Sequence, residues 1–419
     1  MLGITPRMLP KAREMTAARP LRIAMVAGEA SGDQLGVSLL RALAARGVVV
    51  EAFGVGGDAL VAAGLKTLFP QTDIAVMGLG PVLRKLPLLI RRIRETAAAI
   101  IAAKPDILVT IDAPDFCKRV AKRVRAAAPE IPIVHWVCPS VWAWRPGRAP
   151  AMRPYIDHVL CLLPFEPEAL ARLNGPPGTY VGHPLVERLT DLRPQEAREA
   201  ATRASLDRPT LLLLPGSRMS ELRRLMPLLL AAKDVASQDL VATTGMTPRW
   251  VIPTLPHLVA TVRAALGDNK DRIEVISDPG AKRAAMREAR AALAASGTVT
   301  LELALAGIPM VACYRVADWE AAIARRLITV STANLPNLIL GEHVVPEFIQ
   351  QHATPENLGK AFARLLQDSP EFAAQRAAFV RLEQAMRTTG AGPSEKAAAL
   401  VLDLAGKARN RLTHDKPVA

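Results

Sequence analysis

The chain is poor in aromatic residues and cysteines and has no long uninterrupted apolar run. Only 4% of its 419 residues are Phe, Trp or Tyr, and its four cysteines form no CxxC pair. Scattered cysteines fit a reducing compartment and argue against structural disulfides and zinc sites. Because no apolar run reaches 18 residues, the sequence predicts no transmembrane helix. The basic first 20 residues lack the apolar core of a secretory signal.

Two metal-binding patterns are also missing. The seven histidines form no HExxH motif, and no two aspartates have the D-x-D spacing. A sugar-nucleotide site that depends on a D-x-D metal is therefore disfavoured, and we expect no metal and no other cofactor.

The charge balance is strongly basic, with 53 Lys and Arg against 39 Asp and Glu and a formal net charge of +14. Such a balance favours anionic partners, which include nucleic acids, phosphorylated metabolites and anionic membranes. A single-strand binder would space stacking aromatics along a basic stripe. Here three of the five tryptophans fall between Trp136 and Trp144, so we expect no nucleic-acid partner.

Short apolar runs alternate with stretches of helical periodicity. In the first half, strands are predicted at Leu21–Ala27, Val48–Phe53, Ile107–Ile111, Ile131–Val137 and His158–Leu162. In the second half, they are predicted at Thr210–Leu214, Leu240–Thr243, Ile273–Ile276, Ala291–Ala295 and Met310–Tyr314. The alternation predicts an α/β protein with two doubly wound parallel sheets. Ligands would bind at the carboxyl ends of the strands and in the cleft between the two domains.

A polar stretch over 190–208 is the predicted linker. The expected organisation is a loose basic extension over 1–20, a first domain over 21–195 and a second domain over 205–390. A C-terminal helix and a polar tail would occupy 391–419.

Two loops of the first half carry candidate site residues. The first loop follows the first predicted strand, and its glycines and free N–H groups suit an anion; its candidates are Gly28, Glu29, Ser31, Gly32 and Asp33. A simple turn, with Asp33 near the helix start, is the alternative. The second loop contains Asp112, placed to accept a proton from a hydroxyl group, and Asp115, better explained as a helix cap.

Two loops of the second half resemble phosphate-binding loops. Pro215–Arg218 follows a strand and ends in an arginine whose planar guanidinium suits a diphosphate, although the Walker ending is missing. Ser296, Gly297 and Thr298 form the second loop, and Glu302 follows one turn into the next helix, where it could accept two ribose hydroxyls. The nucleotide is therefore placed in the second domain.

The tryptophan-rich run offers Ser140, Trp142 and Trp144 as a platform for a partly apolar, partly anionic ligand. Interior packing of the tryptophans is the alternative. The segment 82–94 interleaves apolar side chains with basic ones, which suits a membrane interface; its candidates are Arg84, Lys85, Arg91 and Arg92. Here the alternative is an ordinary amphipathic helix broken at Pro87.

The order of these motifs resembles the lipid-A-disaccharide synthase family. The resemblance depends on AGEASGD (27–33), VGG (55–57), Met77-Gly78 with Leu86-Pro87, IDAPDF (111–116), PSVWAW (139–144), PFE (164–166), VGHP (181–184), PGSR (215–218), ASGT (295–298) with Glu302, and LPNLI (335–339). Each motif is weak alone, but ten in one order are specific.

The resemblance implies a GT-B fold, two Rossmann-like domains facing across a cleft. It implies transfer of 2,3-diacylglucosamine from UDP to 2,3-diacylglucosamine 1-phosphate (lipid X), with inversion to a β-1,6-linked disaccharide. By motif, Asp112 resembles the general base, Arg218 stabilises the leaving UDP, and the 296–298 loop, Glu302 and Asn337 look like the rest of the UDP site. The glycine loop and the tryptophan platform would line the acceptor side.

The resemblance also implies a cytoplasmic enzyme, peripheral on the inner membrane, and leaves the oligomeric state open, with a homodimer as one option. Pro81, Cys117 and Cys138 depart from the family's usual residues, which puts the lipid segment and the fine positioning of the acceptor in doubt. Another GT-B enzyme acting on UDP-GlcNAc, such as a 2-epimerase, is the competing interpretation.

Overall fold

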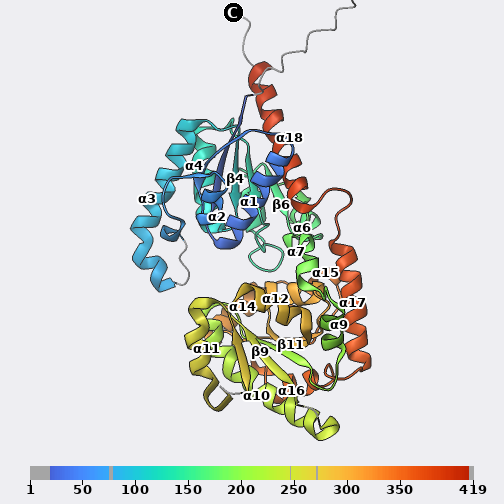
Figure 1. Cartoon of the computed structure of the whole chain (residues 1–419). Coiled ribbons are helices and arrows are strands. Elements are labelled where there is room, and N and C mark those ends of the chain that lie inside the picture. Colours follow the sequence, from blue (N-terminus) through green and yellow to red (C-terminus); the bar gives the residue numbers. More distant parts are fainter. Residues whose placement is uncertain (1–18, 75–78, 246, 270–271, 415–419) are drawn as a thin grey trace, which may run out of the picture. The chain divides into compact units, whose positions relative to one another are not determined.

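Two parallel sheets organise the chain in the computed structural model, which describes residues 19–74, 79–245, 247–269 and 272–414 (Figure 1). The first sheet has the strand order β3-β2-β1-β4-β5-β6-β7. Its strands are β1 (Leu21–Ala27), β2 (Val50–Val55), β3 (Lys66–Thr67), β4 (Ile107–Ile111), β5 (Ile133–Trp136), β6 (His158–Cys161) and β7 (Gly178–Tyr180).

The second sheet has the order β10-β9-β8-β11-β12-β13, and each neighbouring pair is parallel. Its strands are β8 (Thr210–Leu214), β9 (Arg249–Pro253), β10 (Ile273–Ile276), β11 (Ala289–Ala295), β12 (Met310–Tyr314) and β13 (Glu347–Ile349). Parallel strands need crossover connections, and helices provide most of them here.

The helices of the first half are α1 (Ala30–Ala45), α2 (Asp58–Ala62), α3 (Leu79–Ala103), α4 (Pro114–Ala127), α5 (Arg148–Met152), α6 (Glu166–Arg172), α7 (Pro184–Glu187), α8 (Leu189–Leu192) and α9 (Ala197–Ala204). Those of the second half are α10 (Met219–Thr244), α11 (Val259–Leu266), α12 (Pro279–Glu288), α13 (Thr298–Leu305), α14 (Asp318–Leu327), α15 (Leu335–Leu340), α16 (Pro355–Ala363), α17 (Pro370–Met386) and α18 (Pro393–His414). Among the described residues, no helix is long and apolar enough to cross a bilayer.

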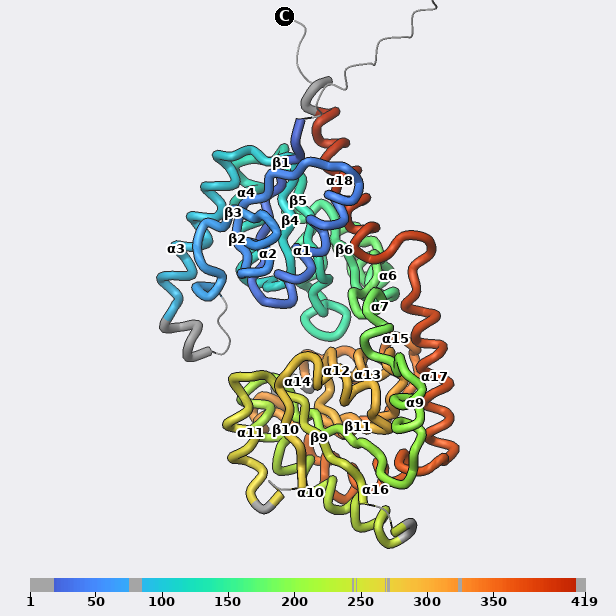
Figure 2. Tube along the Cα trace, in the orientation of Figure 1, coloured from blue at the N-terminus to red at the C-terminus, as the bar shows by residue number. Residues whose placement is uncertain are grey.

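Residue contacts divide the chain into two compact units. The first runs up to Val134 and takes in the chain again from Ala398, and the second is His135–Ala397. Figure 2 shows the red C-terminal helix α18 beside the blue and cyan elements of the first unit. There Arg409 of α18 donates to Asp106, with 2.8 Å between Nε and Oδ1. The domain limits drawn from the sequence stay a prediction.

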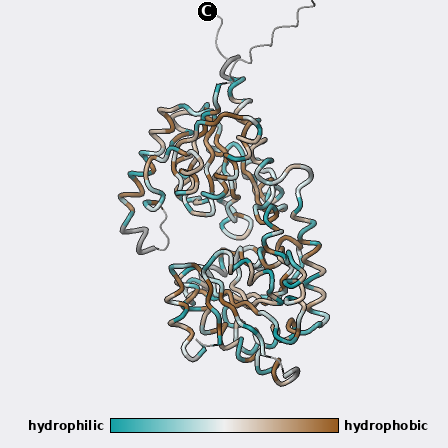
Figure 3. The backbone as a smooth tube through the Cα atoms, viewed as in Figure 1, coloured by the Kyte–Doolittle hydropathy of each residue, from teal (hydrophilic) through white to brown (hydrophobic). Residues whose placement is uncertain are grey.

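The strand β8 shows why its sequence is apolar at successive positions. Successive side chains of a strand point to opposite faces of the sheet. Leu211 and Leu213 pack with α10 and α16 on one face, while Leu212 and Leu214 pack with α13 and α17 on the other. Because helices cover both faces, Leu211 to Leu214 are all buried, and the strand reads as a continuous apolar run. Figure 3 shows hydrophobic segments running through the middle of each unit.

Most predicted strands are confirmed, but Leu240–Thr243 is wrong. Those residues form the last turns of α10, which ends where Gly245 adopts a φ of +71°. Leu240 packs in the core with Ala236, one helical turn earlier, whereas Val241 and Ala242 are exposed, so only Leu240 of this run belongs to the buried helix face. The strand of this region is β9, which the sequence analysis missed together with the short strands β3, β7 and β13. The predicted break at Pro87 is also wrong, because α3 continues through it.

Strand register brings the predicted loops together in pairs. Ala27 of β1 is paired with Ile111 of β4, so the glycine loop and Asp112 leave the sheet side by side. Leu214 of β8 is paired with Ala294 of β11, so the loops that contain Arg218 and Gly297 are also neighbours. In each sheet the strand order reverses at this pair, which is where doubly wound folds bind ligands.

Candidate active site

Asp112 lies at the carboxyl end of β4 in a strained turn. Asp112 and Ala113 both have a positive φ, of 52° and 41°, which residues other than glycine rarely adopt. The Ser31 hydroxyl donates to Oδ2 of Asp112 at 3.3 Å, and the Ala113 N–H donates to Oδ1 at 2.9 Å. The turn thus holds a partly exposed carboxylate in a fixed direction, with a hydroxyl beside it.

Two glycines of the first predicted loop lie where there is little room for a side chain. A Cβ on Gly28 would lie 2.3 Å from the Cβ of Ala113, and a Cβ on Gly32 would lie 3.2 Å from the carbonyl oxygen of Ile111. Both positions let α1 approach the turn that carries Asp112. Their role is therefore to place the loop, whatever ligand it meets.

Asp33 has a structural position. It is buried, and its carboxylate accepts the N–H groups of Gly57 at 2.6 Å, Ala59 at 3.1 Å and Leu60 at 3.3 Å. These are N–H groups at the start of α2, so Asp33 caps that helix from a distance. The alternative in which Asp33 serves the fold fits this geometry. Glu29, half-buried at the N-terminus of α1, and the exposed Ser31 lie closer to solvent.

The tryptophan platform is brought together in the second unit. The Trp144 indole N–H donates to the Ser140 hydroxyl at 3.0 Å, and the Trp142 indole N–H donates to Glu166 at 3.3 Å. Trp142 also meets the ring of Phe165 edge-on, with 5.0 Å between centroids. Both indoles are partly buried. They are neither fully exposed, as an open ligand platform would be, nor fully packed in the interior, as the alternative predicts.

Glu166 is buried beneath this platform, and the sequence analysis gave it no role of its own. It accepts the N–H groups of Leu162 at 2.9 Å and Leu163 at 3.0 Å. Those hydrogen bonds and the one from Trp142 lower the pKa of Glu166. Burial has the larger effect and raises that pKa to about 7. Its protonation therefore changes near neutral pH.

A pH-dependent stability is expected from this carboxyl group. The folded protein keeps a proton on Glu166 between pH 4.5 and about 7, where the unfolded chain has released it, so the free energy of unfolding falls by about 3 kcal/mol as the pH rises through that range. Glu166→Gln should remove this part of the pH dependence. Urea unfolding of both proteins from pH 5 to pH 8 measures the difference, and identical profiles would contradict the assignment.

The same carboxylate belongs to the described cluster best able to hold a metal. Ligand atoms of Cys138, Cys161 and Glu166 lie within 4.8 Å of one another, and all three residues are buried. A hydrogen bond with Cys161 and burial raise the pKa of Cys138 well above its usual range, so the Cys138 thiol stays neutral in this arrangement. The three residues come from separate segments, which is why a search for linear motifs misses them.

The second unit contains a cavity of about 610 Å³, the nucleotide pocket, at the carboxyl ends of β8 and β11. It brings together most of the predicted UDP residues: Arg218, Ser296, Gly297, Thr298 and Glu302. Gly297 is the N-cap of α13, and it has no side chain with which to cap that helix. The first N–H groups of α13 therefore face a site where an anion would be stabilised.

Arg218 is held by an acidic neighbour that the sequence analysis missed. Its guanidinium lies 3.3 Å from Glu221, whose other carboxylate oxygen accepts the N–H groups of Ser217 and Arg218 at 3.1 and 3.3 Å. A Cβ on Gly216 would lie 2.4 Å from that oxygen, and Gly216 has a φ of +106°. The glycine thus makes room for a carboxylate that orients the arginine.

Three further cations line the nucleotide pocket: Arg188, Lys282 and Arg283. Burial raises the pKa of Glu302, and the charges of Lys282 and Arg188 oppose that effect. Lys282 and Arg283 lie on α12, whose start is capped by Asp278 through a 2.7 Å bond from the Ala281 N–H. The Asp-Pro-Gly sequence at the start of α12 is typical of a helix N-terminus. It was the sequence signal that could have pointed to Lys282 and Arg283.

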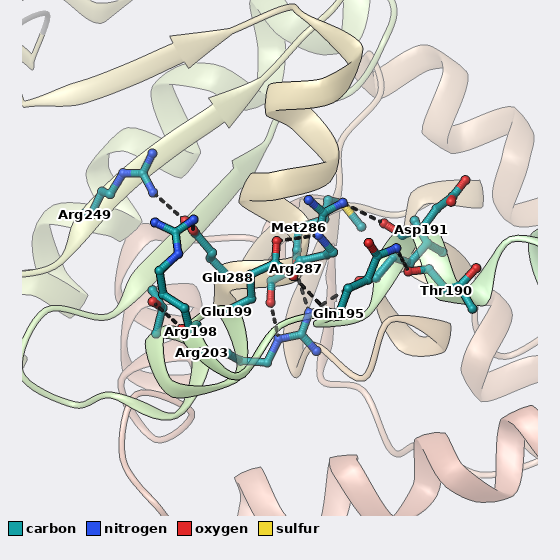
Figure 4. Close-up of polar contacts among 12 residues, drawn as sticks. Thr190, Asp191, Gln195, Arg198, Glu199, Arg203, Arg249, Met286, Arg287 and Glu288 are labelled. Atoms are coloured by element: carbon teal, nitrogen blue, oxygen red, sulfur yellow. Dashed lines mark hydrogen bonds and ion pairs between the residues drawn. The ribbon is translucent and has the colours of Figure 1, made fainter.

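A polar network fixes the other end of α12 (Figure 4). Arg203 of α9 donates to the carbonyl oxygens of Met286 at 2.7 Å and Arg287 at 2.8 Å. The Arg287 guanidinium pairs with Glu199 at 2.7 Å. Since both charged side chains of that pair are largely buried, separating them would leave an unpaired charge in the interior. The network holds α12 and its two pocket cations in place.

The role of Asn337 in the UDP site stays a prediction. This residue does not line the nucleotide pocket. Its side chain donates to the carbonyl oxygen of Val345 and accepts the N–H of Val345, both at 2.9 Å, and it is 2% exposed. Because its amide is used by the backbone, the geometry gives Asn337 a structural position under the loop that follows α15.

The basic segment divides into exposed and engaged residues. The side chain of Arg84 lies outside the described part of the chain, as does most of the predicted extension over 1–20. Lys85 and Arg91 are exposed. Arg92 instead pairs with Asp73 at 2.6 Å and with Glu95 at 2.7 Å, so its charge is used within the fold.

Similarity to known proteins covers nearly the whole chain. The family model for lipid-A-disaccharide synthetase matches residues 23–401. The chain is 51% identical over 383 residues to the lipid-A-disaccharide synthase of Nitrobacter hamburgensis, which covers 91% of this chain and 95% of the relative. It is 47% identical over 400 residues to that of Rhodopseudomonas palustris, with 95% and 100% covered.

Solved structures with lower identity show the fold. The S. aureus MnaA–UDP co-structure has a TM-score of 0.59 at 14% identity and covers 95% of this chain and 99% of that one. The calicheamicin glycosyltransferase CalG4 has a TM-score of 0.55 at 18% identity, with 93% and 99% covered. The predicted GT-B fold class is confirmed. Together with the family match, this shows that the chain belongs to the lipid-A-disaccharide synthase family of glycosyltransferases.

Proposed function

We propose that this protein transfers 2,3-diacylglucosamine from its UDP carrier to the 6-hydroxyl of 2,3-diacylglucosamine 1-phosphate, giving a β-1,6-linked disaccharide 1-phosphate and UDP. The observation that carries the proposal is the nucleotide pocket, which combines Arg218, the free N-terminus of α13 and Glu302 at one strand-order reversal. The names of the relatives support the same reaction.

The nucleotide pocket suits a nucleoside diphosphate. The α13 N–H groups and the Arg218 fork donate to phosphate oxygens, and Arg188 and Lys282 add positive charge. Glu302 accepts the ribose hydroxyls. When the sugar–phosphate bond breaks, negative charge grows on the leaving UDP, and these fixed donors stabilise it more than the ground state.

Asp112 is the proposed general base. The acceptor hydroxyl is a weak nucleophile, so its proton must leave as the new bond forms. A lone pair of the acceptor hydroxyl oxygen then attacks the anomeric carbon of the donor sugar from the face opposite UDP. The bond to UDP breaks, and the configuration at that carbon is inverted. The proton passes to Asp112, whose carboxylate is held by Ser31 and Ala113. The transfer therefore needs no reactant besides the donor and the acceptor.

The substrates are amphiphiles, so we also propose that the protein works at an anionic membrane, the cytoplasmic face of the inner membrane. Exposed Lys85 and Arg91 on α3 support this, beside Leu86, which is 37% exposed. Each basic residue near an anionic surface contributes about 1 kcal/mol.

Charge reversal at Arg91 tests the membrane contact. Arg91→Glu should weaken binding to vesicles containing anionic lipid by about tenfold or more, because it removes one attraction and adds one repulsion. Arg263→Glu, which changes an exposed arginine of α11 by the same charge, is the matched control and should bind as the wild type does. Vesicle sedimentation measures both. Equal binding by all three proteins would remove α3 from the membrane proposal.

One assay tests the reaction itself. The purified protein is incubated with UDP-diacylglucosamine and lipid X, with and without EDTA, and the products are identified by mass spectrometry. A disaccharide 1-phosphate with stoichiometric UDP is expected in both conditions. The competing candidate, suggested by structural similarity to UDP-GlcNAc 2-epimerases, would instead convert plain UDP-GlcNAc and form no disaccharide.

A further inference from the structure

The second unit contains another cavity, of about 470 Å³, whose wall is mostly apolar. Three of the chain's five tryptophans line it, Trp142, Trp144 and Trp319, together with Ile328 and Leu338. We call it the tryptophan pocket. Trp319 is 59% exposed and Ile328 is 49% exposed. Large apolar side chains are seldom left in water together unless they meet an apolar partner.

Backbone contacts preform this pocket. Trp144 and Ile328 form an antiparallel bridge, and Thr329 donates its N–H to the Ala143 carbonyl at 2.8 Å and its hydroxyl to the Trp142 carbonyl at 3.0 Å. The loop after β5 is thereby joined to the segment after α14. The two walls are held before any ligand arrives, which is usual for small-molecule sites.

The tryptophan pocket and the nucleotide pocket are joined by one carboxylate. One oxygen of Glu347 accepts the hydroxyl of Ser296, which lines the nucleotide pocket, at 2.7 Å. The other oxygen accepts the hydroxyl of Thr332, which lines the tryptophan pocket, at 2.6 Å. An apolar group bound here would therefore lie close to a bound sugar nucleotide.

Positive charge lies beside the apolar wall. The guanidinium of Arg145 lies 4.7 Å from the ring centre of Trp144, and that of Arg148 lies 5.1 Å from it. Arg145 lines the tryptophan pocket and forms no ion pair with any residue that the structure describes. Its φ of 52° places an exposed arginine in a conformation that costs backbone energy. Apolar walls with two adjacent cations are complementary to an amphiphile with an anionic head.

We propose that the tryptophan pocket binds an acyl chain of the acceptor, with Arg145 and Arg148 at the acceptor's 1-phosphate. This inference rests on the proposed function. The acceptor is favoured over the donor because the donor's diphosphate already has its own cations, Arg218, Arg188 and Lys282, in the nucleotide pocket. Arg145 and Arg148 are then left for the single phosphate of the acceptor. The cavity volume lies within the range of sites for small molecules.

The first test changes the apolar wall. Ile328→Glu should lower kcat/KM about tenfold or more for an acceptor with long acyl chains and leave kcat/KM unchanged for an acceptor with acetyl groups in their place. Val380→Glu is the matched control, because Val380 is similarly exposed, at 57%, and lies on α17 outside this pocket. A loss that is equal for both acceptors would overturn the proposal, as would a change in the KM of the donor alone.

The second test changes the charge. Arg145→Ala should raise the KM of the phosphorylated acceptor and leave the KM of its 1-hydroxyl analogue unchanged. An equal effect on both acceptors would overturn the assignment of the phosphate.

A binding measurement separates this inference from the reaction. Lipid X with brominated acyl chains should quench the tryptophan fluorescence of the wild-type protein, and Trp319→Phe should reduce that quenching. If the wild type makes no disaccharide but is quenched in this way, the proposed reaction fails and the pocket stands. If disaccharide forms but Trp319→Phe does not alter the quenching, the pocket fails and the reaction stands.

Discussion

Replacing Asp112 by asparagine is expected to lower turnover by about 10³-fold, the loss typical of a missing general base. The substitution is unusually mild for the fold. Asparagine tolerates a positive φ better than almost any other side chain, so it fits the turn in which Asp112 has a φ of 52°. Its amide oxygen can still accept the Ala113 N–H, and its amide NH2, in the place of Oδ2, can donate to the Ser31 hydroxyl oxygen. The basic carboxylate alone is lost.

A neighbouring aspartate supplies the control for this prediction. Asp115 lies in the first turn of α4, and Asp115→Asn makes the same chemical change three residues away. We expect its turnover to stay within a few-fold of the wild type. Steady-state kinetics with both substrates, together with thermal unfolding, measure the two variants. If Asp112→Asn folds normally and retains wild-type kcat, another group removes the proton.

The strands that the sequence predicts best are those buried on both faces. Thr210–Leu214 is five residues long, lies next to the predicted linker and is followed by a proline–glycine turn, so its ends are marked locally. Leu240–Thr243 has a similar composition, yet it closes a helix of 26 residues. Apolar content alone does not separate a buried strand from the buried face of a long helix. The burial of Leu240 in a core formed with residues of distant segments decides between them, and those contacts are tertiary.

Strand-end loops could be predicted because parallel topology gathers them. The pairs Ala27–Ile111 and Leu214–Ala294 follow from strand order, and so does the meeting of Arg218 with Gly297. Partners that come from distant segments could not be predicted in this way, and Glu347, which accepts the Ser296 hydroxyl, is an example. The contacts of Glu221 with Arg218 and of Asn337 with Val345 are short-range, but the motifs alone did not show that these side chains bond within the fold. A motif indicates which residues meet a site, but hydrogen bonds decide which remain available to a ligand.

Arg218→Ala is expected to produce the second-largest loss. The planar guanidinium of the arginine donates to a diphosphate whose negative charge grows in the transition state. Removing one such donor costs roughly 2.7–4 kcal/mol, which lowers kcat by about 10²–10³-fold. The effect has a second source in this protein, because Glu221 loses its partner at 3.3 Å and would then present an uncompensated negative charge to UDP. Affinity for UDP should therefore fall together with kcat.

Two variants separate these contributions. Arg218→Lys keeps the charge opposite Glu221 and removes the fork, so it should restore part of the UDP affinity and little of kcat. Arg223→Ala removes an exposed arginine of the same helix that does not line the nucleotide pocket, and it should behave as the wild type. Calorimetric titration with UDP and steady-state kinetics give both quantities for each protein. If Arg218→Ala binds UDP and turns over like Arg223→Ala, Arg218 does not hold the diphosphate, and the α13 N–H groups with Lys282 would have to hold it alone.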